Sequence, residues 1–364
     1  MDVLDCVQKM AAFDPPLNRS HLLLMSLRGL TSPQMVAFLN GETEIAARGN
    51  VPAKQRSDYL VAHPEDTTDF ARWKRWEEKG FWALTILDDA YPARLREIDP
   101  IPFVLYGCGD PSVLTGFSLA VVGTRHPSAY GVSCTNLFAE GLAMHGATIV
   151  SGLAYGIDSL AHRSALRVGR PTVAVLANGL DRIYPAANRS LAEEILKDGC
   201  LLSEYPPGVL PLPHHFIARN RLISGLSDGV LVIEAKRRSG TMITVNWACE
   251  QGKNVFCVPG NISQPRSEGT NAQIQRGAYL VTGIDDILQA YDLKPRTFEE
   301  AKKARETLTA MEGALYDILR QAPSGADELA RAFPLGVSDL WMCLTSLEMK
   351  GKITRRSDGK FETR

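Results

Sequence analysis

The sequence predicts an α/β protein built around a doubly wound, mostly parallel β-sheet with a Rossmann-like order of elements. Between about residues 115 and 290, short apolar runs alternate with amphipathic helical patterns, as expected when helices connect parallel strands. The runs are SLAVVG, ATIVSG, TVAVLANG, CLLSE, GVLVIEA and NVFCVPG. Continuous apolar runs are typical of strands covered on both faces. Most of them end in glycine or a small polar residue, so a ligand site is expected beyond the carboxyl ends of the strands.

Residues 1–65 are predicted to form a small helical domain. The stretches LNRSHLLLMSLRGL and SPQMVAFLNGETEIAARG have helix-period apolar positions separated by a short turn. This pattern resembles a sterile-alpha-motif (SAM) or helix-hairpin-helix module. The glycine pair of a DNA-contacting hairpin is missing, which favours a packing or interaction role over a DNA-reading one.

Residues 66–293 are predicted to form the sheet domain, with its core at 115–290. The domain begins with a helix in TTDFARWKRWEEKG and a strand in FWALTIL. The prolines that follow indicate turns and an irregular connection, and they are Pro92, Pro100, Pro102 and Pro111.

A charged linker is predicted at 294–310, followed by a winged-helix domain at 311–364. Three helical patterns, GALYDILRQA, ADELARAF and VSDLWMCLTSLEMKG, precede a hairpin whose turn is Asp358-Gly359. The presumed recognition helix is nearly uncharged, which disfavours reading of a DNA major groove. A protein-contact or regulatory role is therefore favoured, with phosphate contacts by the basic tail as the alternative.

Composition limits the classes of function. The chain has 364 residues and a formal net charge of −1, so an anion site must be a local basic patch. No apolar run reaches the ~20 residues of a membrane helix, and the N-terminus lacks a signal-peptide pattern. Seven scattered cysteines without C-x-x-C spacing indicate neither a zinc site nor disulfides, and favour a cytoplasmic location. No metal or cofactor is indicated.

The turn in AVVGTRHPSAYG, residues 120–131, departs from a dinucleotide-binding motif. Gly123 and Thr124 are followed by Arg125, where G-x-G-x-x-G has its second glycine. That glycine lets the backbone approach a pyrophosphate, so Arg125 makes the turn poor for a dinucleotide. A guanidinium suits a phosphate, and amides at a helix N-terminus add to anion affinity. The equal alternative is that Arg125 pairs with a carboxylate on a neighbouring loop.

The stretch SGLAYGIDSLAHRSAL, residues 151–166, contains a possible acid–base pair. Ser151 and Gly152 end a strand and are expected to shape one wall of the site. Asp158 and His162 have i, i+4 spacing and share a helix face, as an acid and a base would need. No nucleophile stands at a defined spacing, and Asp158 is placed to cap the helix. A structural role for this pair is therefore favoured.

The stretch FIARNRLISGLSDGVLVIEAKRRSGT, residues 216–241, is the most informative. Phe216 precedes Arg219 and Arg221, with Asn220 between them. Cations that hold phosphates beside a ring that stacks a base suit a single nucleic-acid strand. The alternative is that Phe216 belongs to the core and the arginines to a solvated face. The loop Ser239-Gly240-Thr241 should meet the Arg125 turn at the same sheet edge, which favours binding.

Two further loops bear on chemistry. Nucleoside-monophosphate phosphoribohydrolases on a similar sheet use P-G-G-x-G-T-x-x-E, whereas here the glycine pair is absent and Thr244 occupies the glutamate position. This fits binding without hydrolysis, with a hydrolase or a nucleotide-binding protein as the alternative.

Gly269-Thr270-Asn271 precedes a short helix, where either a phosphate site or a plain capping motif is expected.

Taken together, eight runs in order resemble the DNA-processing protein A family (DprA, also called Smf). They are YPARLREIDPIPFVLYGCG, VVGTRHPSAYG, SGLAYGIDSLAH, GLDRIYPAAN, SEYPPG, FIARNRLISGLSD, SGTMITVNWACEQGKNVFCVPG and GTNAQIQRGA, spanning roughly 80–290. The resemblance implies a protein without enzymatic activity that binds and protects single-stranded DNA without sequence preference. It also implies a role in DNA recombination or natural transformation, loading of the RecA recombinase, and homodimers formed through the Rossmann-like domain.

The resemblance also assigns site residues. Arg125 matches the family's G-S/T-R arginine, Phe216 matches the phenylalanine of F-x-x-R-N, and Lys253 lies in a Q-G-K/R segment. Where some relatives have a lysine before that phenylalanine, this chain has Pro213, His214 and His215. The predicted DNA-binding residues are Gly123, Thr124, Arg125, Ser151, Gly152, Phe216, Arg219, Asn220, Arg221, Ser239, Gly240, Thr241, Lys253 and Asn271.

Overall fold

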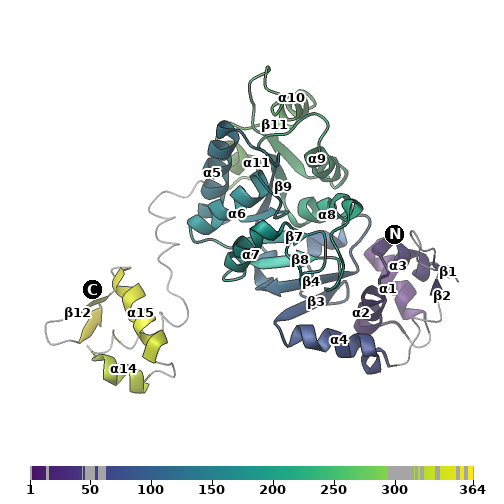
Figure 1. Cartoon of the computed structure of the whole chain (residues 1–364), viewed down its shortest axis with the longest axis horizontal. Coiled ribbons are helices and arrows are strands. Elements are labelled where there is room, and N and C mark those ends of the chain that lie inside the picture. The colour runs from purple at the N-terminus through teal and green to yellow at the C-terminus, as the bar shows by residue number, and fades with distance from the viewer. Residues whose placement is uncertain are drawn as a thin grey trace. The chain divides into compact units, whose positions relative to one another are not determined.

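A computed structural model describes most of the chain (Figure 1). The described residues are 2–13, 16–42, 44–45, 54–55, 63–293, 315, 319, 324–332, 337–349, 353–355 and 360–363. The chain divides into two compact units, Met1–Pro295 and Arg296–Arg364. The predicted linker at 294–310 lies outside the described residues. The domain boundary expected at residue 65 stays a prediction.

The first unit contains a mostly parallel sheet. In the part of the chain that the structure describes, nine strands follow the order β11-β10-β9-β5-β6-β7-β8-β4-β3. Strands β5 to β11 pair in parallel, whereas β4 pairs antiparallel with both β8 and β3. The bounds are β3 Phe81–Thr85, β4 Val104–Gly109, β5 Ser118–Val122, β6 Thr148–Ser151, β7 Thr172–Leu176, β8 Cys200–Ser203, β9 Gly229–Val232, β10 Asn254–Cys257 and β11 Tyr279–Leu280.

These strands confirm the predicted fold class, with one correction. All six apolar runs are strands, and the predicted strand in FWALTIL is β3. The region after it, expected to be an irregular connection, also contains β4. Pro102 and Pro111 flank β4 without interrupting it, so they mark its ends and not the absence of a strand.

Helices cover both faces of the sheet (Figure 1). Side chains alternate along β5, so Leu119 and Val121 pack in one core with Phe138 of α5, while Ala120 and Val122 share the other core with Leu222 of α8. Both sets are buried, which explains the continuous apolar runs. The helices of this unit beyond residue 63 are α4 Thr68–Glu77, α5 Ala129–Met144, α6 Ile157–Arg167, α7 Arg189–Ile195, α8 Pro213–Leu226, α9 Gly240–Glu250, α10 Glu268–Gln275 and α11 Ile284–Ala290. In the described ranges, no helix combines the length and apolarity needed to span a bilayer.

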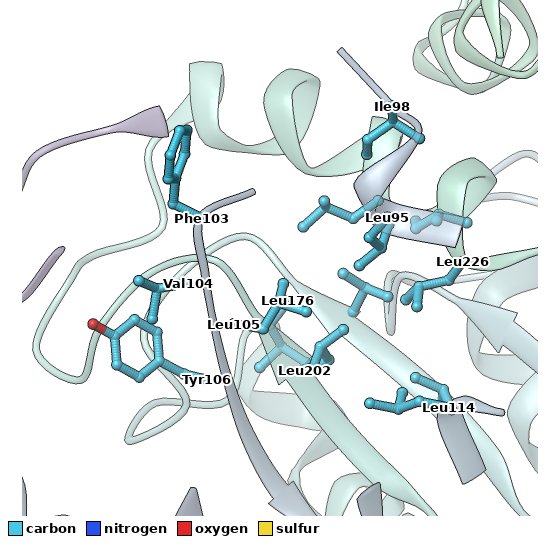
Figure 2. Packing of buried hydrophobic residues seen from close by; sticks show 14 of the residues in the cluster. Leu95, Ile98, Phe103, Val104, Leu105, Tyr106, Leu114, Leu176, Leu202 and Leu226 are labelled. Carbon is cyan, nitrogen blue, oxygen red and sulfur yellow. The ribbon is translucent and has the colours of Figure 1, made fainter. Parts of the chain in front are cut away.

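The N-terminal helices pack on the antiparallel end of the sheet. They are α1 Val3–Ala11, α2 Arg19–Leu27 and α3 Ser32–Leu39, followed by the short antiparallel pair β1 Glu44–Ile45 and β2 Lys54–Gln55. The Tyr106 hydroxyl of β4 donates to Ser26 Oγ of α2 at 2.8 Å, and the Tyr106 ring lies 5.4 Å from that of Trp73. Figure 2 shows Phe103, Val104 and Tyr106 on one strand, with Leu105 directed toward Leu202 and Leu176 of the parallel part. Helices α2 and α3 confirm the first predicted stretch and the start of the second, but the second helix ends at Leu39, and Glu44–Ile45 of that stretch form strand β1 instead. The helices share one continuous core with the sheet.

The second unit has the elements of a winged helix. Helices α14 Ala326–Ala332 and α15 Val337–Met349 precede the antiparallel strands β12 Ile353–Arg355 and β13 Phe361–Thr363. Leu329, Leu344 and Phe361 are buried in their shared core. The last two predicted helices and the hairpin are therefore confirmed. Most of the first helical pattern, 313–322, and the Asp358-Gly359 turn lie outside the described residues.

Candidate functional site

The candidate site lies where the strand order reverses. Strand β5 has β6 on one side and β9 on the other, and ligands of doubly wound sheets bind beyond the carboxyl ends of the strands at such a point. We call the loops 123–128, 152–156, 177–188 and 233–235, together with residues 213–220 of α8, the mouth. Thr124 joins three of these loops: its N–H donates to Glu234 O at 2.8 Å, and its carbonyl accepts from Ile157 N at 3.2 Å.

A buried carboxylate occupies the N-terminus of α5. Glu234, which is 4% exposed, accepts from Ser128 N at 2.9 Å and from Ser128 Oγ at 2.5 Å. A Cβ on Gly131 would overlap this carboxylate. A negative charge is favourable at a helix N-terminus, where dinucleotide-binding folds hold a pyrophosphate. The chain's own side chain therefore fills that position, which explains why the glycine pattern is broken.

Arg125 is exposed at the mouth. Among the described residues, its side chain has neither an ion pair nor a hydrogen bond, so the alternative pairing with a carboxylate is not observed. Its positive charge contributes to the lowered pKa of Arg219. Gly156 lets the loop after β6 lie against the Arg125 turn, because at φ +77° a Cβ there would lie 2.7 Å from the Cα of Arg125.

Arg219 is buried beneath the mouth. It is 4% exposed, and its Nη1 donates to Gly152 O at 2.9 Å and also to Val175 O. A Cβ on Gly152 would lie 2.8 Å from its Cζ. Burial lowers the pKa of Arg219 to about 10, with Asp158 opposing this shift and Arg125 adding to it. Arg219 therefore joins the ends of β6 and β7, and its burial argues against the predicted direct phosphate contact.

Arg221 faces away from the mouth. It is 3% exposed, and its Nη2 donates to Glu204 Oε1 at 2.6 Å and Oε2 at 2.7 Å. Ser32 Oγ of α3 donates to the same carboxylate at 2.6 Å. The structure thus corrects the expectation that Arg221 holds phosphate, because the side chain is buried and its Nη2 already donates to both oxygens of a carboxylate.

Three of the predicted DNA-binding residues are not placed to contact a ligand at the mouth. They are Lys253, Asn271 and Ser151. Lys253 precedes β10, whose Asn254 pairs with Gly229 at the amino ends of the strands, so it lies at the opposite edge of the sheet. The Asn271 amide donates to Gly260 O at 2.9 Å and accepts from Gly260 N at 3.1 Å. Ser151 Oγ is buried and donates to Val121 O at 2.7 Å. These contacts support roles in holding loops together.

The turn Ser239-Gly240-Thr241 does reach the mouth. Asn220 Nδ2 donates to Gly240 O at 3.4 Å, and Asn220 Oδ1 accepts from Arg219 Nε at 3.3 Å. Ser239 is the N-cap of α9, and its Oγ is buried without a hydrogen-bond partner in the described part of the chain. Gly240 is exposed and Thr241 half-buried. The structure therefore brings together Arg125, the Gly123–Thr124 turn, Phe216, Arg219, Asn220 and this turn.

An aromatic pair at the mouth was only partly foreseen. The half-buried Phe216 ring lies 5.9 Å from Arg219 Cζ and 5.5 Å from the ring of Tyr184. Tyr184 is 48% exposed and follows β7 in the run GLDRIYPAAN. The run contributed to the family resemblance, but its ring was not assigned a role. The signal was available, because an aromatic residue in a loop after a parallel strand must lie at this edge.

Asp158 and His162 have separate protein partners. Asp158 Oδ2 accepts from Gly152 N at 3.1 Å, and burial raises the pKa of Asp158 while Arg219 lowers it. His162 Nδ1 lies 2.8 Å from Thr172 Oγ1, which itself donates to Ile149 O at 2.6 Å, so Nδ1 is the donor. These contacts support the structural interpretation. Across the described ranges, no cluster of three His, Cys, Asp or Glu side chains is arranged to hold a metal ion.

His162 should make folding sensitive to acid. Burial lowers the pKa of His162 from 6.5 to about 3, so the unfolded chain binds this proton before the folded one does. The stability that neutral His162 contributes is therefore fully present above about pH 6.5 and is lost as the pH falls toward about 3. We expect this group to lower the free energy of unfolding by about 2 kcal/mol between about pH 8 and about pH 5.

Urea unfolding of the wild type and of His162→Asn across that range measures this contribution. The asparagine amide can donate to Thr172 Oγ1 but does not titrate, so the decline should be smaller in the variant by the stated amount. Equal declines in the two proteins would show that His162 is not the group responsible.

Comparisons with known sequences agree with this fold. The family model described as DNA recombination-mediator protein A matches residues 82–292, and the DprA winged helix domain matches 299–359. Protein Smf of Escherichia coli (strain K12) is 48% identical over 200 residues, which cover 55% of this chain and 54% of that protein. DNA processing protein DprA of Streptococcus pneumoniae is 45% identical over 216 residues, covering 59% of this chain and 76% of that protein. The match thus spans about half the length of the E. coli relative.

Solved structures show the same architecture. DprA from Streptococcus pneumoniae superposes with a TM-score of 0.62 at 38% identity, covering 75% of this chain and 98% of that one. DprA from Helicobacter pylori, described for its single-stranded DNA binding mode, superposes with a TM-score of 0.53 at 33% identity, covering 59% of this chain and 97% of that one. The chain therefore belongs to the DNA recombination-mediator protein A family.

Proposed function

We propose that the chain binds single-stranded DNA at the mouth and acts as a recombination mediator. The observation that carries the proposal is an exposed Arg125 at the same edge of the sheet as a half-buried Phe216, whose ring neighbours the exposed Tyr184. A cation without a carboxylate partner beside stacking rings is what an unpaired strand requires. The H. pylori relative described as binding single-stranded DNA supports the proposal.

Each group at the mouth then has a distinct task. Arg125 contacts a phosphate, while Phe216 and Tyr184 stack on bases. Arg219 supports the Phe216 ring from below, since its guanidinium lies 5.9 Å from the ring centroid and is held by backbone carbonyls. Because every base has a face that can stack, this binding needs no particular sequence. The bound DNA is thereby protected, and its base sequence is not recognised.

The protein is proposed to act without catalysis. Thr244, at the position where the phosphoribohydrolase motif has its glutamate, is 2% exposed inside α9. The carboxylate nearest the turn after β5 is Glu234, whose oxygens accept two hydrogen bonds from Ser128. Release of free base from a nucleoside monophosphate would contradict this part of the proposal.

The remaining proposals concern partners and location. We infer that the chain is cytoplasmic, forms homodimers through the Rossmann-like domain, and loads the RecA recombinase during transformation or recombination. The edge strand β11 supports the dimer, because Tyr279 and Leu280 are 50% and 49% exposed and an open edge can pair with another chain. Two mouths in one dimer would hold a strand by avidity. A monomer in light scattering at working concentrations would contradict the dimer.

Arg125→Ala should weaken single-strand binding without unfolding the protein. Loss of one charge-assisted phosphate contact should lower affinity about tenfold or more and reduce the slope of log affinity against log salt by about 0.7. Fluorescence anisotropy with a labelled oligonucleotide over a salt series measures both quantities.

Arg72→Ala is the matched control, because Arg72 is exposed on α4, which packs on β3 at the other end of the sheet. It removes the same charge and should leave affinity and slope unchanged. If Arg125→Ala is folded and binds like the wild type, Arg125 is not a DNA contact.

A further inference from the structure

A basic cavity is lined by residues of α9 and α10 and of the loop after β9; Figure 1 shows α9 and α10 on the same side of the sheet domain. Its volume is about 400 Å³. Arg237 and Arg238 line it from the loop after β9, Met242 from α9, and Gln273 and Arg276 from α10 and its end. The lining therefore contains three guanidinium groups and no carboxylate.

Within the described part of the chain, the three arginines have no counter-ions. Arg237, Arg238 and Arg276 are exposed, and among the described residues none of them forms an ion pair or a side-chain hydrogen bond. Other arginines of the same unit, namely Arg28, Arg94 and Arg221, each pair with an aspartate or glutamate. Three unpaired positive charges lining one concave site attract an anion.

The walls of the cavity are fixed by contacts between its elements. Gly269 N donates to Ala235 O at 2.8 Å, and a Cβ on Gly269 would lie 2.6 Å from that oxygen. Ala235 N in turn donates to Arg266 O at 2.7 Å. Gln273 Nε2 lies 3.6 Å from Met242 Sδ, which joins α10 to α9. These contacts fix the backbone of the loop after β9 against α10, and α10 against α9.

Two links join the elements around the cavity to the mouth. Arg237 and Arg238 directly precede the Ser239-Gly240 turn, and Gly240 O accepts from Asn220 of the mouth at 3.4 Å. On the other side, Arg266 Nε donates at 2.7 Å to the carbonyl of His126, the residue after Arg125. These links place the cavity beside the mouth.

We propose that this cavity binds the phosphodiester backbone of the same single strand that the mouth holds. Arg237, Arg238 and Arg276 contact phosphates through their forked donors, and the Gln273 amide donates to a phosphate or sugar oxygen. The thioether of Met242 packs against a sugar or base. This inference rests on the proposed function and extends the DNA path beyond the mouth.

The test uses the full chain and two labelled oligothymidylates, of about 4 and about 16 nucleotides, which bracket the site sizes of single-strand grooves. The short one can occupy the mouth alone. The double variant Arg237→Ala/Arg276→Ala should bind the long one about tenfold or more weakly. Its salt slope for that strand should fall by about 1.4, or two phosphate contacts, whereas binding of the short one should be unchanged.

Lys236→Ala is the matched control, since Lys236 is exposed in the same loop but does not line the cavity. It should leave both affinities unchanged, and the unfolding midpoint shows that each variant is folded. Wild-type affinity of the double variant for the long strand overturns the inference. So does an equal loss for both lengths, because that result indicates a general charge effect. Failure of the wild-type chain to bind either strand overturns the proposed function itself, a result separate from the other two.

Discussion

Arg219→Ala is expected to destabilise the protein by about 3–5 kcal/mol and to weaken single-strand binding. The substitution leaves the carbonyls of Gly152 and Val175 without the donor they share. It also removes the cation that lowers the pKa of the buried Asp158 and the support beneath the Phe216 ring. Urea unfolding and anisotropy on the same samples measure the two effects.

The pH dependence of this loss follows from Asp158. Burial raises the pKa of Asp158, and Arg219 opposes that rise, so the pKa should rise further in the variant. A carboxyl with a raised folded-state pKa contributes stability below its unfolded pKa and loses it as the pH increases. The penalty of Arg219→Ala should therefore be larger at about pH 7 than at about pH 4.

Phe216→Leu separates the two roles of this site. It keeps the buried guanidinium, so stability should change little, while loss of stacking should cost about 1–3 kcal/mol of binding free energy. Arg219→Lys should restore only part of the stability, because an ammonium lacks the planar fork that serves two carbonyls. An Arg219→Ala protein with a wild-type unfolding midpoint would refute the structural role.

Arg221→Ala is expected to cost about 3–5 kcal/mol of stability, since it leaves a buried carboxylate without its cation. The Arg221 and Glu204 side chains are 4% and 13% exposed, and Ser32 Oγ would be the remaining donor to Glu204 of those described. Because Ser32 begins α3, the loss should also loosen the N-terminal helices. Hydrogen exchange of residues 19–39 reports that effect alongside the unfolding midpoint.

The double variant Arg221→Leu/Glu204→Leu completes the test. Removal of both charges together should be less destabilising than Arg221→Ala alone, because no unpaired ion remains buried. Arg94→Ala is the control: Arg94 and Asp228 are 27% and 24% exposed, and a pair of that kind contributes about 1 kcal/mol or less. If the stability lost in the double variant equals the sum of the losses in the two single leucine variants, the Arg221 and Glu204 side chains are not coupled.

Much of the fold could be predicted because its signals are local. Each apolar run is a strand since burial on both faces demands continuous apolar residues, and alternation with helices makes the strands parallel. Parallel strands present all their carboxyl ends at one edge, which predicted that the Arg125 turn, Phe216 and the Ser239-Gly240 turn lie at the same edge of the sheet. Strand β4 was overlooked because the prolines around it suggested an irregular region.

The site was harder to predict because exposure and pairing depend on residues far away in the chain. Arg219 and Arg221 lie two positions apart on α8 and so point to opposite sides of the helix. Gly152 and Val175 accept from Arg219, while Glu204 receives Arg221. Lys253 was placed at the mouth by a motif, but it precedes its strand and lies at the other edge.

Residue order alone predicted which side chains follow each strand and hence the edge of the proposed site, because strand direction and helix period are local properties. Which of those cations remain unpaired was decided by the tertiary structure. A guanidinium that meets buried carbonyls or a carboxylate exchanges water for those partners, as Arg219 and Arg221 do, whereas Arg125 meets none within the described part of the chain. That difference arises from packing between segments distant in the chain, and no pattern within a single stretch contains it.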